Sequence, residues 1–248
     1  MTDQPLSGKS ALVTGGARRI GRGIALALAA AGSDVAITFR SSHAEAEQTV
    51  RDIENLGRAS LAIECDVRSE GSVRSAVAAA VGRFGRLDLA VNNAAVFESS
   101  SLESLTLEQW NVAFETNARG PFLVAREALP HLHAVEGRIV NIGSLGGIHA
   151  WASHAHYCAS KAALHSLTQA MAKSFAPEVS VNCVAPGWIE LDGTENERGG
   201  EQATHFAAKT PMRRNGSVED VAQAVLFFAA GPHFITGQIL VVDGGLGL

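Results

Sequence analysis

Seven short apolar runs recur along the chain, and residues with helical periodicity follow each run except the last. Strands alternating with helices are typical of a parallel sheet, because each strand returns through a helix, and right-handed crossovers place these helices on both faces. The sequence therefore predicts an α/β fold, a doubly wound parallel seven-stranded sheet with helices on both faces. We expect strands at 10–14, 34–39, 59–64, 87–91, 139–142, 179–184 and 238–242. We expect helices at 24–31, 44–56, 69–84, 106–133, 157–175, 201–208 and 218–229.

The composition narrows the class of protein. With 248 residues, 46% of them hydrophobic, we expect a single domain that spans residues 1–248. The net charge of -5 offers no basic surface for nucleic acid. Apolar stretches are too short for a membrane span, and the N-terminus lacks the apolar core of a signal peptide. The three cysteines form no CxxC pair, which indicates reduced thiols and a cytoplasmic protein.

A glycine-rich loop, residues 15–21, lies directly between the first predicted strand and a helix. The glycines let the backbone approach a pyrophosphate, and the helix N-terminus adds N–H groups and the positive end of its dipole. This context favours a dinucleotide site that includes Gly15 and Gly21.

The end of the second predicted strand distinguishes between two forms of the dinucleotide. A carboxylate there would bind the ribose 2′-OH of NAD, but Arg40 and Ser41 occupy this place. Arg18 and Arg19 add positive charge from the glycine-rich loop. Because arginine binds phosphate in a bidentate manner, we expect a site for the 2′-phosphate of NADP(H). The alternative is that these arginines are ordinary solvated side chains.

Tyr157 is the only tyrosine, and Lys161 follows it by four residues. Positions i and i+4 share one face of a helix, so the ammonium would lie beside the phenol and lower its pKa from about 10. Such a phenol can act as a general acid or base. Ser144, after the preceding strand, could hydrogen-bond the same reacting oxygen. The alternative for the pair alone is an exposed, solvated ion–phenol contact.

Two further segments carry predictions. We expect the long helical region 106–133 to bend at Gly120–Pro121. Asn117, a poor helix former within it, is either a local kink with a solvated amide or a polar group kept for a purpose. Residues 190–215 lack periodicity, which predicts a substrate-binding loop or lid.

Nearly the whole chain resembles the classical short-chain dehydrogenase/reductase family. The resemblance rests on residues 14–21, Asp66–Val67, Asn92–Asn93–Ala94, Asn117, Ser144, the Tyr157-x-x-x-Lys161 pair and Pro186–Gly187, in that order. It implies a Rossmann fold, a homotetramer and a small-molecule carbonyl or alcohol substrate.

The resemblance also implies roles for individual residues. Tyr157 would be the acid–base, Ser144 would polarise the carbonyl oxygen, Lys161 would hold the nicotinamide ribose, and Asn117 would hold a water in a proton relay. Asp66 and Val67 would flank the adenine, Asn92 would lie at the adenosine-side ribose, and Ile189 would contact the carboxamide. The expected cofactor-binding set is Gly15, Arg18, Arg19, Ile20, Gly21, Arg40, Ser41, Asp66, Val67, Asn93, Ala94, Tyr157, Lys161, Pro186, Gly187 and Ile189.

The chain departs from the family pattern at two positions. The family usually has glycine where Arg19 stands, and an arginine there resembles the pteridine reductase branch; that branch typically has an aspartate where this chain has Ser144. Threonine is frequent where Leu191 stands, and Thr194 could replace its hydrogen bond to the nicotinamide end.

The leading hypothesis is an NADPH-dependent oxidoreductase that reduces a ketone or aldehyde, a 3-oxoacyl group among the options, with Tyr157 as proton donor. The alternatives are a pteridine reductase-like enzyme and a non-catalytic NADP-binding regulator. His149, His154 and His156 lack the helix spacing of a HExxH-type zinc site, so we expect no metal.

Overall fold

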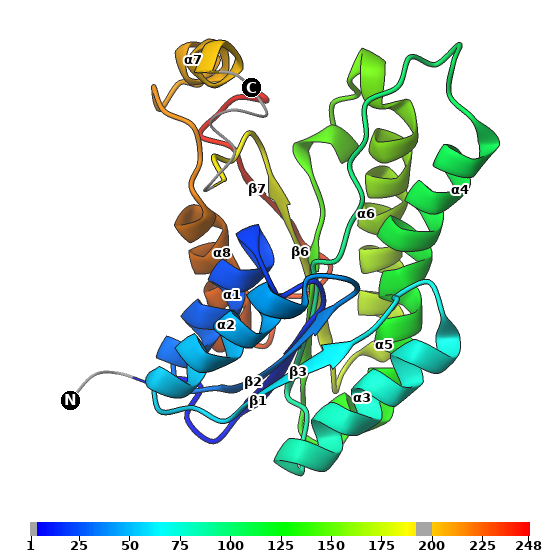
Figure 1. The fold of residues 1–248 in the computed structure, drawn as a ribbon. Helices are drawn as coiled ribbons and strands as arrows, with labels where there is room; N and C mark the ends of the chain where they lie inside the picture. Colours follow the sequence, from blue (N-terminus) through cyan, green and yellow to red (C-terminus); the bar gives the residue numbers. More distant parts are fainter. Residues whose placement is uncertain (1–3, 192–199) are drawn as a thin grey trace.

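The seven predicted strands pair into one parallel sheet with the order β3-β2-β1-β4-β5-β6-β7 (Figure 1). The computed structural model describes residues 4–191 and 200–248. The strands are β1 (Ser10–Val13), β2 (Asp34–Phe39), β3 (Ser60–Glu64), β4 (Leu89–Asn92), β5 (Arg138–Ile142), β6 (Ser180–Pro186) and β7 (Ile239–Val242). The predicted doubly wound parallel sheet is therefore confirmed.

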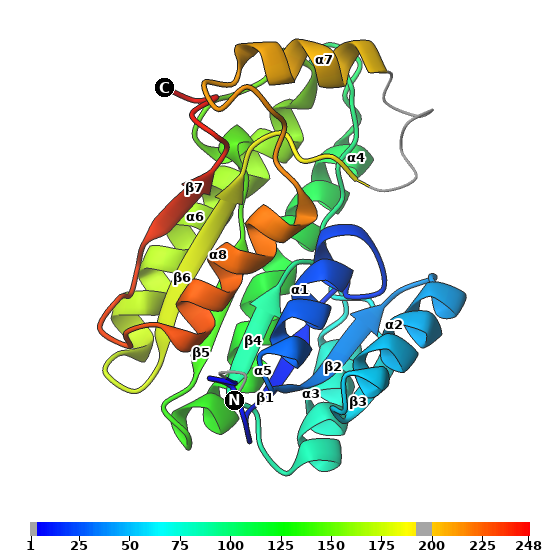
Figure 2. The same cartoon turned by 90° about the vertical axis from the view of Figure 1, so that its left-hand side faces the viewer.

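Helices cover both faces of the sheet, with α1, α2 and α8 on one face and α3, α5 and α6 on the other (Figure 1, Figure 2). The α-helices are α1 (Arg19–Ala30), α2 (His43–Asn55), α3 (Glu70–Phe84), α4 (Leu107–Phe114), α5 (Gly120–His133), α6 (Ala155–Phe175), α7 (Gly200–Lys209) and α8 (Val218–Ala230). Ile24 and Val225 belong to one buried core, and Val77 and Leu132 to the other. Each face thus buries its own apolar layer against the sheet. Among the described residues, no helix is long and apolar enough to cross a membrane.

The strand order determines where a ligand can bind. β1 lies between β2 and β4, so the chain leaves β1 toward one side of the sheet and returns to β4 on the other. The connections after β1 and β4 therefore diverge and leave a crevice at the carboxyl ends of the strands, the usual ligand position in such sheets.

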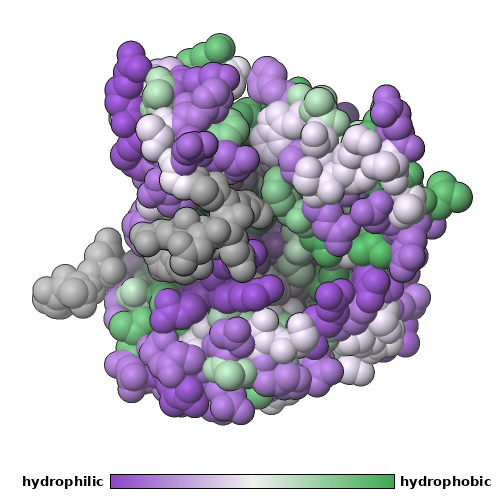
Figure 3. All heavy atoms as spheres, turned by 45° about the horizontal axis from the view of Figure 1, so that its top comes forward, coloured by the Kyte–Doolittle hydropathy of each residue, from purple (hydrophilic) through white to green (hydrophobic). Residues whose placement is uncertain are grey.

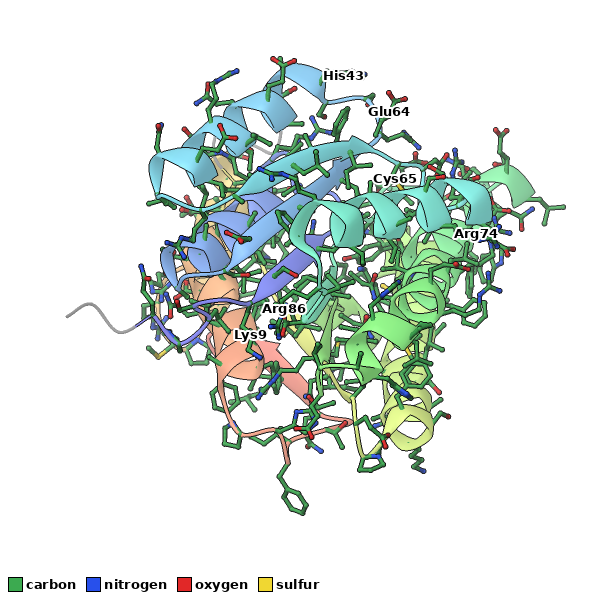
Figure 4. All side chains as sticks on the ribbon, turned by 90° about the horizontal axis from the view of Figure 1, so that it is seen from below. Lys9, His43, Glu64, Cys65, Arg74 and Arg86 are labelled. Carbon is green, nitrogen blue, oxygen red and sulfur yellow. The ribbon has the colours of Figure 1, made fainter. Side chains whose placement is uncertain are left out.

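At the opposite end of the sheet, the buried carboxylate of Asp88 joins β1 to β4. Lys9 and Arg86, adjacent in Figure 4, both form ion pairs with Asp88, and the backbone N–H of Ser10 donates to the same carboxylate at 3.0 Å. Burial alone would raise the pKa of Asp88, but the hydrogen bonds from Arg86 and Ser10 outweigh it and hold this pKa below its usual range. The two central strands are thereby fixed at the end remote from the crevice.

The helical region 106–133 differs from the prediction. The irregularity is a π-helix, η1 (Glu115–Arg119), between α4 and α5, whereas Gly120 and Pro121 are the regular first residues of α5. Proline is tolerated at the start of α5 because its fixed φ is already helical. The wide turn lies at Asn117, whose side chain bonds to other segments rather than to water.

Two other boundaries differ. Helix α6 begins at Ala155, two residues before the predicted start, so Tyr157 lies in its first turn. The lid was predicted at residues 190–215. Part of it, residues 192–199 with Thr194 among them, lies outside the described residues. Its described part contains α7, which confirms the short helix expected at 201–208.

Candidate active site

A cleft of about 390 Å³ opens at the carboxyl ends of the strands. Figure 3 tilts this end of the molecule toward the reader and shows hydrophilic and hydrophobic residues around a hollowed surface. Of the predicted site residues that the structure describes, all except Asn92 and Asn117 line the cleft: Gly15, Arg18, Arg19, Ile20, Gly21, Arg40, Ser41, Asp66, Val67, Asn93, Ala94, Ser144, Tyr157, Lys161, Pro186, Gly187 and Ile189. Residues from distant parts of the sequence are thus brought to one place.

The glycine-rich loop is held by the residues that follow β4. The side-chain amide of Asn93 donates to the carbonyls of Thr14 and Gly15 at 2.9 and 3.1 Å. The hydroxyl of Thr14 accepts the N–H groups of Asn93 and Ala94. A Cβ atom at Gly21 would collide with the carbonyl oxygen of Gly15. This loop leaves no room for a side chain at Gly21, and such a close-packed backbone turn fits a dinucleotide diphosphate.

Asn92 and Asn93 have different surroundings. Asn92 is the last residue of β4, is 3% exposed, and donates its amide to Asn141 Oδ1 at 2.8 Å. Successive strand residues point to opposite sides, so Asn93 lines the cleft and Asn92 does not. The buried position of Asn92 thus does not agree with the ribose contact that the resemblance implies for it.

One half of the cleft is cationic. Arg18, Arg19 and Arg40 are exposed along its edge. Arg19 has φ +53°, a left-handed conformation that favours glycine and costs an L-residue about 1–2 kcal/mol. Asp66 pairs with Arg68 at 2.6 Å, and these hydrogen bonds hold the pKa of Asp66 below its usual range.

Tyr157 and Lys161 lie one helical turn apart on α6. The ammonium of Lys161 is 5.8 Å from the centre of the phenol ring and donates to the carbonyl of Ile142 at 2.7 Å. Lys161 is only 3% exposed, and burial lowers its pKa to about 8. The i,i+4 arrangement predicted from the sequence is present, and the solvated-pair alternative is wrong because the ammonium is buried.

Ser144 begins the short 3-10 helix η2 (Leu145–Gly147) just after β5. Its hydroxyl oxygen accepts the N–H of Gly146 at 3.0 Å, which fixes the oxygen while the hydroxyl hydrogen can point to another acceptor. The backbone N–H of Ser144 donates to His165 Nε2 at 3.4 Å. The turn that carries the hydroxyl is therefore held from two directions.

His165 is a site residue that the sequence prediction missed. It follows Lys161 by four residues, so Tyr157, Lys161 and His165 form one stripe along α6. Burial and the neighbouring charge of Lys161 lower the pKa of His165 to about 4. The ring is neutral at ordinary pH, with Nε2 as an acceptor. The spacing of four residues from Lys161 to His165 was the available signal. The sequence does not show that His165 contacts the backbone of Ser144 after β5.

Asn117 lies behind the cleft and is fully buried. Its side-chain oxygen accepts the N–H of Val96 at 2.9 Å, and its amide donates to the Val96 carbonyl and to Ser160 Oγ, each at 3.0 Å. The side chain thus joins the π-helix, the segment after β4 and α6. Both amide hydrogens have protein partners, so the water relay implied by the resemblance stays a prediction.

Aromatic side chains surround Tyr157 in the other half of the cleft. Phe97 meets the phenol ring edge-on at 4.7 Å between centroids, and Trp151 stacks on it at 6.2 Å. Trp188, which also lines the cleft, stacks on Phe206 of α7 at 4.2 Å. Phe97, Trp188 and Phe206 were not among the predicted site residues.

The histidines near Tyr157 have separate environments. His154 stacks on Phe97, whereas His156 is 2% exposed with its Nδ1 atom unpartnered in the described part of the chain. Within residues 4–191 and 200–248, no three His, Cys, Asp or Glu side chains form a group that could hold a metal ion.

Comparison with known proteins agrees with this geometry. The family model that matches residues 15–247 is described as enoyl-(acyl carrier protein) reductase. The 3-oxoacyl-[acyl-carrier-protein] reductase FabG of Staphylococcus aureus is 36% identical over 96% of this chain and 98% of that protein. The chain belongs to the short-chain dehydrogenase/reductase family.

Solved structures of the family extend the similarity. A short-chain dehydrogenase from Burkholderia cenocepacia, solved in complex with NADP, has a TM-score of 0.91 and 39% identity, covering 98% of this chain and 100% of that one. A blue fluorescent protein from a metagenomic library, in complex with NADPH, has a TM-score of 0.90 and 37% identity, covering 99% and 100%. The chain is therefore an oxidoreductase of the short-chain dehydrogenase/reductase type.

The low pKa of His165 predicts a pH-dependent loss of stability. In the unfolded protein, His165 binds a proton as pH falls below about 6.5. In the folded protein it stays neutral until about pH 4. The unfolding free energy at pH 5 should therefore be about 2 kcal/mol lower than at pH 8 because of this residue. Urea denaturation of the wild type and His165→Gln at both values measures the difference.

His133→Gln, which removes an exposed histidine, serves as the control and should keep the wild-type pH dependence. An equal loss of stability in the wild type and His165→Gln would contradict the buried neutral ring.

Proposed function

We propose that the protein is an NADPH-dependent carbonyl reductase that converts a ketone or aldehyde to an alcohol. The observation that carries the proposal is that Ser144, Tyr157 and Lys161 line the same cleft as the close-packed glycine-rich loop. The loop suits the diphosphate, and the NADP and NADPH complexes of two similar structures support the choice of dinucleotide. The bound dinucleotide would supply the hydride to the carbonyl carbon.

The side chains of this protein supply the proton and hold the carbonyl. Tyr157 would give its phenolic proton to the oxygen as the C=O bond is reduced, which leaves a phenolate on the enzyme. The nearby ammonium of Lys161 favours that phenolate by its charge. The Ser144 hydroxyl, with its oxygen fixed by Gly146, would donate to the same carbonyl oxygen.

The preference for NADPH rests on the cationic half of the cleft. Arg18, Arg19 and Arg40 are exposed and available to a 2′-phosphate, and the segment after β2 carries no carboxylate for a ribose 2′-OH. Arg19 holds a strained backbone conformation that glycine would adopt freely. Strain of this kind is typical of a position kept for binding.

The two alternatives make different predictions in one assay. A pteridine reductase would oxidise NADPH with a dihydropteridine, and Ser144 in place of the aspartate of that branch argues against it. A regulator would bind NADPH without turnover, and the joint presence of Ser144, Tyr157 and Lys161 argues against that. The similarity to FabG makes 3-oxoacyl thioesters one substrate class to include in a carbonyl panel.

We further propose a single-domain protein that works in the cytoplasm as a homotetramer, with residues 190–215 as the substrate loop. Apolar side chains on α4 and α5 support association: Leu107 is 80% and Phe122 is 42% exposed in the single chain. Contact with another copy would remove such surface from water.

Loss of the phenolic hydroxyl should abolish proton delivery. Tyr157→Phe is expected to lower kcat by about 10²–10⁴, the usual contribution of a general acid. NADPH binding, measured by the fluorescence of the reduced nicotinamide, should change little, because the aromatic ring is retained. Turnover that survives in Tyr157→Phe would contradict the proposed proton donor.

Replacing Arg19 with glycine should raise the unfolding free energy of the protein and lower its affinity for NADPH. Arg19→Gly removes the left-handed strain, so the unfolding free energy should rise by about 1 kcal/mol. The loss of a charge-assisted hydrogen bond should weaken NADPH binding by about tenfold or more and leave NADH binding nearly unchanged. Denaturant unfolding and cofactor titration measure the two effects.

Arg213→Gly is the matched control, since Arg213 also has a positive φ, +57°, and does not line the cleft. It should leave the ratio of NADPH to NADH affinity unchanged. A selective loss of NADPH affinity in the control, or none in Arg19→Gly, would count against the phosphate contact.

A further inference from the structure

The two halves of the cleft differ in chemistry, and the difference follows the order of the sheet. Arg18, Arg19, Arg40 and Asp66 come from the segments after β1, β2 and β3, on one side of the crevice. Phe97, Trp151 and Trp188 come from the segments after β4, β5 and β6, on the other. The described lining of this second half contains one charged side chain, Lys161, which is 3% exposed.

The aromatic side chains of this half are held in place rather than loosely exposed. Phe97 directly follows Val96, whose N–H and carbonyl are both bonded to Asn117. Trp188 stacks on Phe206 with an interplanar angle of 15°. Phe97 lines the cleft and is 38% exposed, although the ring of His154 stacks on it at 4.6 Å. Fixed aromatic faces of this kind bind other aromatic rings with little loss of conformational entropy.

The phenol of Tyr157 belongs to the same cluster. Its ring contacts Phe97 edge-on and stacks on Trp151. A carbonyl oxygen that receives the proton of Tyr157 therefore brings the groups attached to its carbon against these rings. An aromatic ring bonded directly to the carbonyl carbon would make these contacts, whereas a charged group there would lose its hydration, and Lys161 is the one charged side chain in the described lining of this half.

From this arrangement we infer that the substrate is an aryl ketone or aryl aldehyde with an uncharged ring attached to the reacting carbonyl. The inference rests on the proposed carbonyl reduction and adds the substrate class. Phe97, which contacts the phenol ring, and Trp188, which lines the same half of the cleft, would select the ring. Tyr157 belongs to the reaction itself and is left unchanged in the test.

The test compares two ketones of nearly the same shape, acetophenone and cyclohexyl methyl ketone, in the NADPH oxidation assay. Wild-type kcat/KM should favour acetophenone by about tenfold. Phe97→Leu and Trp188→Leu should each lower this preference by about threefold to tenfold, the usual worth of an aromatic pair. Comparing the ratio between variants cancels the different intrinsic reactivity of the two ketones.

Phe234→Leu is the control, because Phe234 is 99% exposed and does not line the cleft. It should leave the preference unchanged. Equal kcat/KM for the two ketones, a preference that neither variant lowers, or a higher kcat/KM for acetoacetyl-CoA than for acetophenone would each overturn the aryl class while carbonyl reduction stands.

Calorimetric binding separates the two proposals. Acetophenone should bind the NADP⁺-loaded protein at least about fivefold more tightly than cyclohexyl methyl ketone, and Phe97→Leu should remove this difference. If this binding preference is found but no ketone is turned over, the proposed reduction fails and the aromatic site is supported. Equal binding of the two ketones overturns the inference, whatever the activity.

Discussion

The buried ammonium of Lys161 is the interaction on which the site depends. Removing it from water disfavours the charged form, and burial lowers its pKa to about 8. The hydrogen bond to the carbonyl of Ile142 offsets part of the cost, and it forms only when α6 is docked at the end of β5. The same docking brings His165 to the N–H of Ser144. Helix, strand end and the turn carrying the serine hydroxyl are therefore fixed together, and the phenol is carried with them.

Much of the fold could be predicted because the relevant signals are local. Apolar runs alternating with helices define a parallel sheet, and the spacing of Tyr157 and Lys161 places them on one helical face whatever surrounds them. The sequence could not show that Asn93 lines the cleft and that Asn92 is buried. A shift of one residue in the end of a strand moves a side chain from the core to the cleft, and the sequence does not determine that end to one residue.

Other features depend on partners that are remote in the sequence. Asn117 was recognisable as a poor helix former, but Val96 and Ser160 determine that its amide is buried in a π-helix instead of solvated at a bend. The aromatic half of the cleft also depends on residues that are remote from one another in the sequence. Phe97, Trp151 and Trp188 follow three different strands. The sequence does not show how the loops that carry them are placed relative to one another. Only the folded chain shows that Phe97 and Trp151 contact the ring of Tyr157 and that Trp188 lines the same cleft.

Arg19 shows how a local rule can be broken for the benefit of a site. A left-handed residue after a strand is the natural place for glycine, and the family usually has glycine there. Among the described residues no hydrogen bond or ion pair of Arg19 offsets this conformation, which is the kind of strain that suggests a binding position. An anion is the ligand that a guanidinium binds best. Arg19 lies in the cationic half and Phe97 in the aromatic half. Under the proposed function, cofactor preference and substrate preference would therefore reside in separate groups of side chains, and either could change by substitution while Tyr157 and Lys161 are kept.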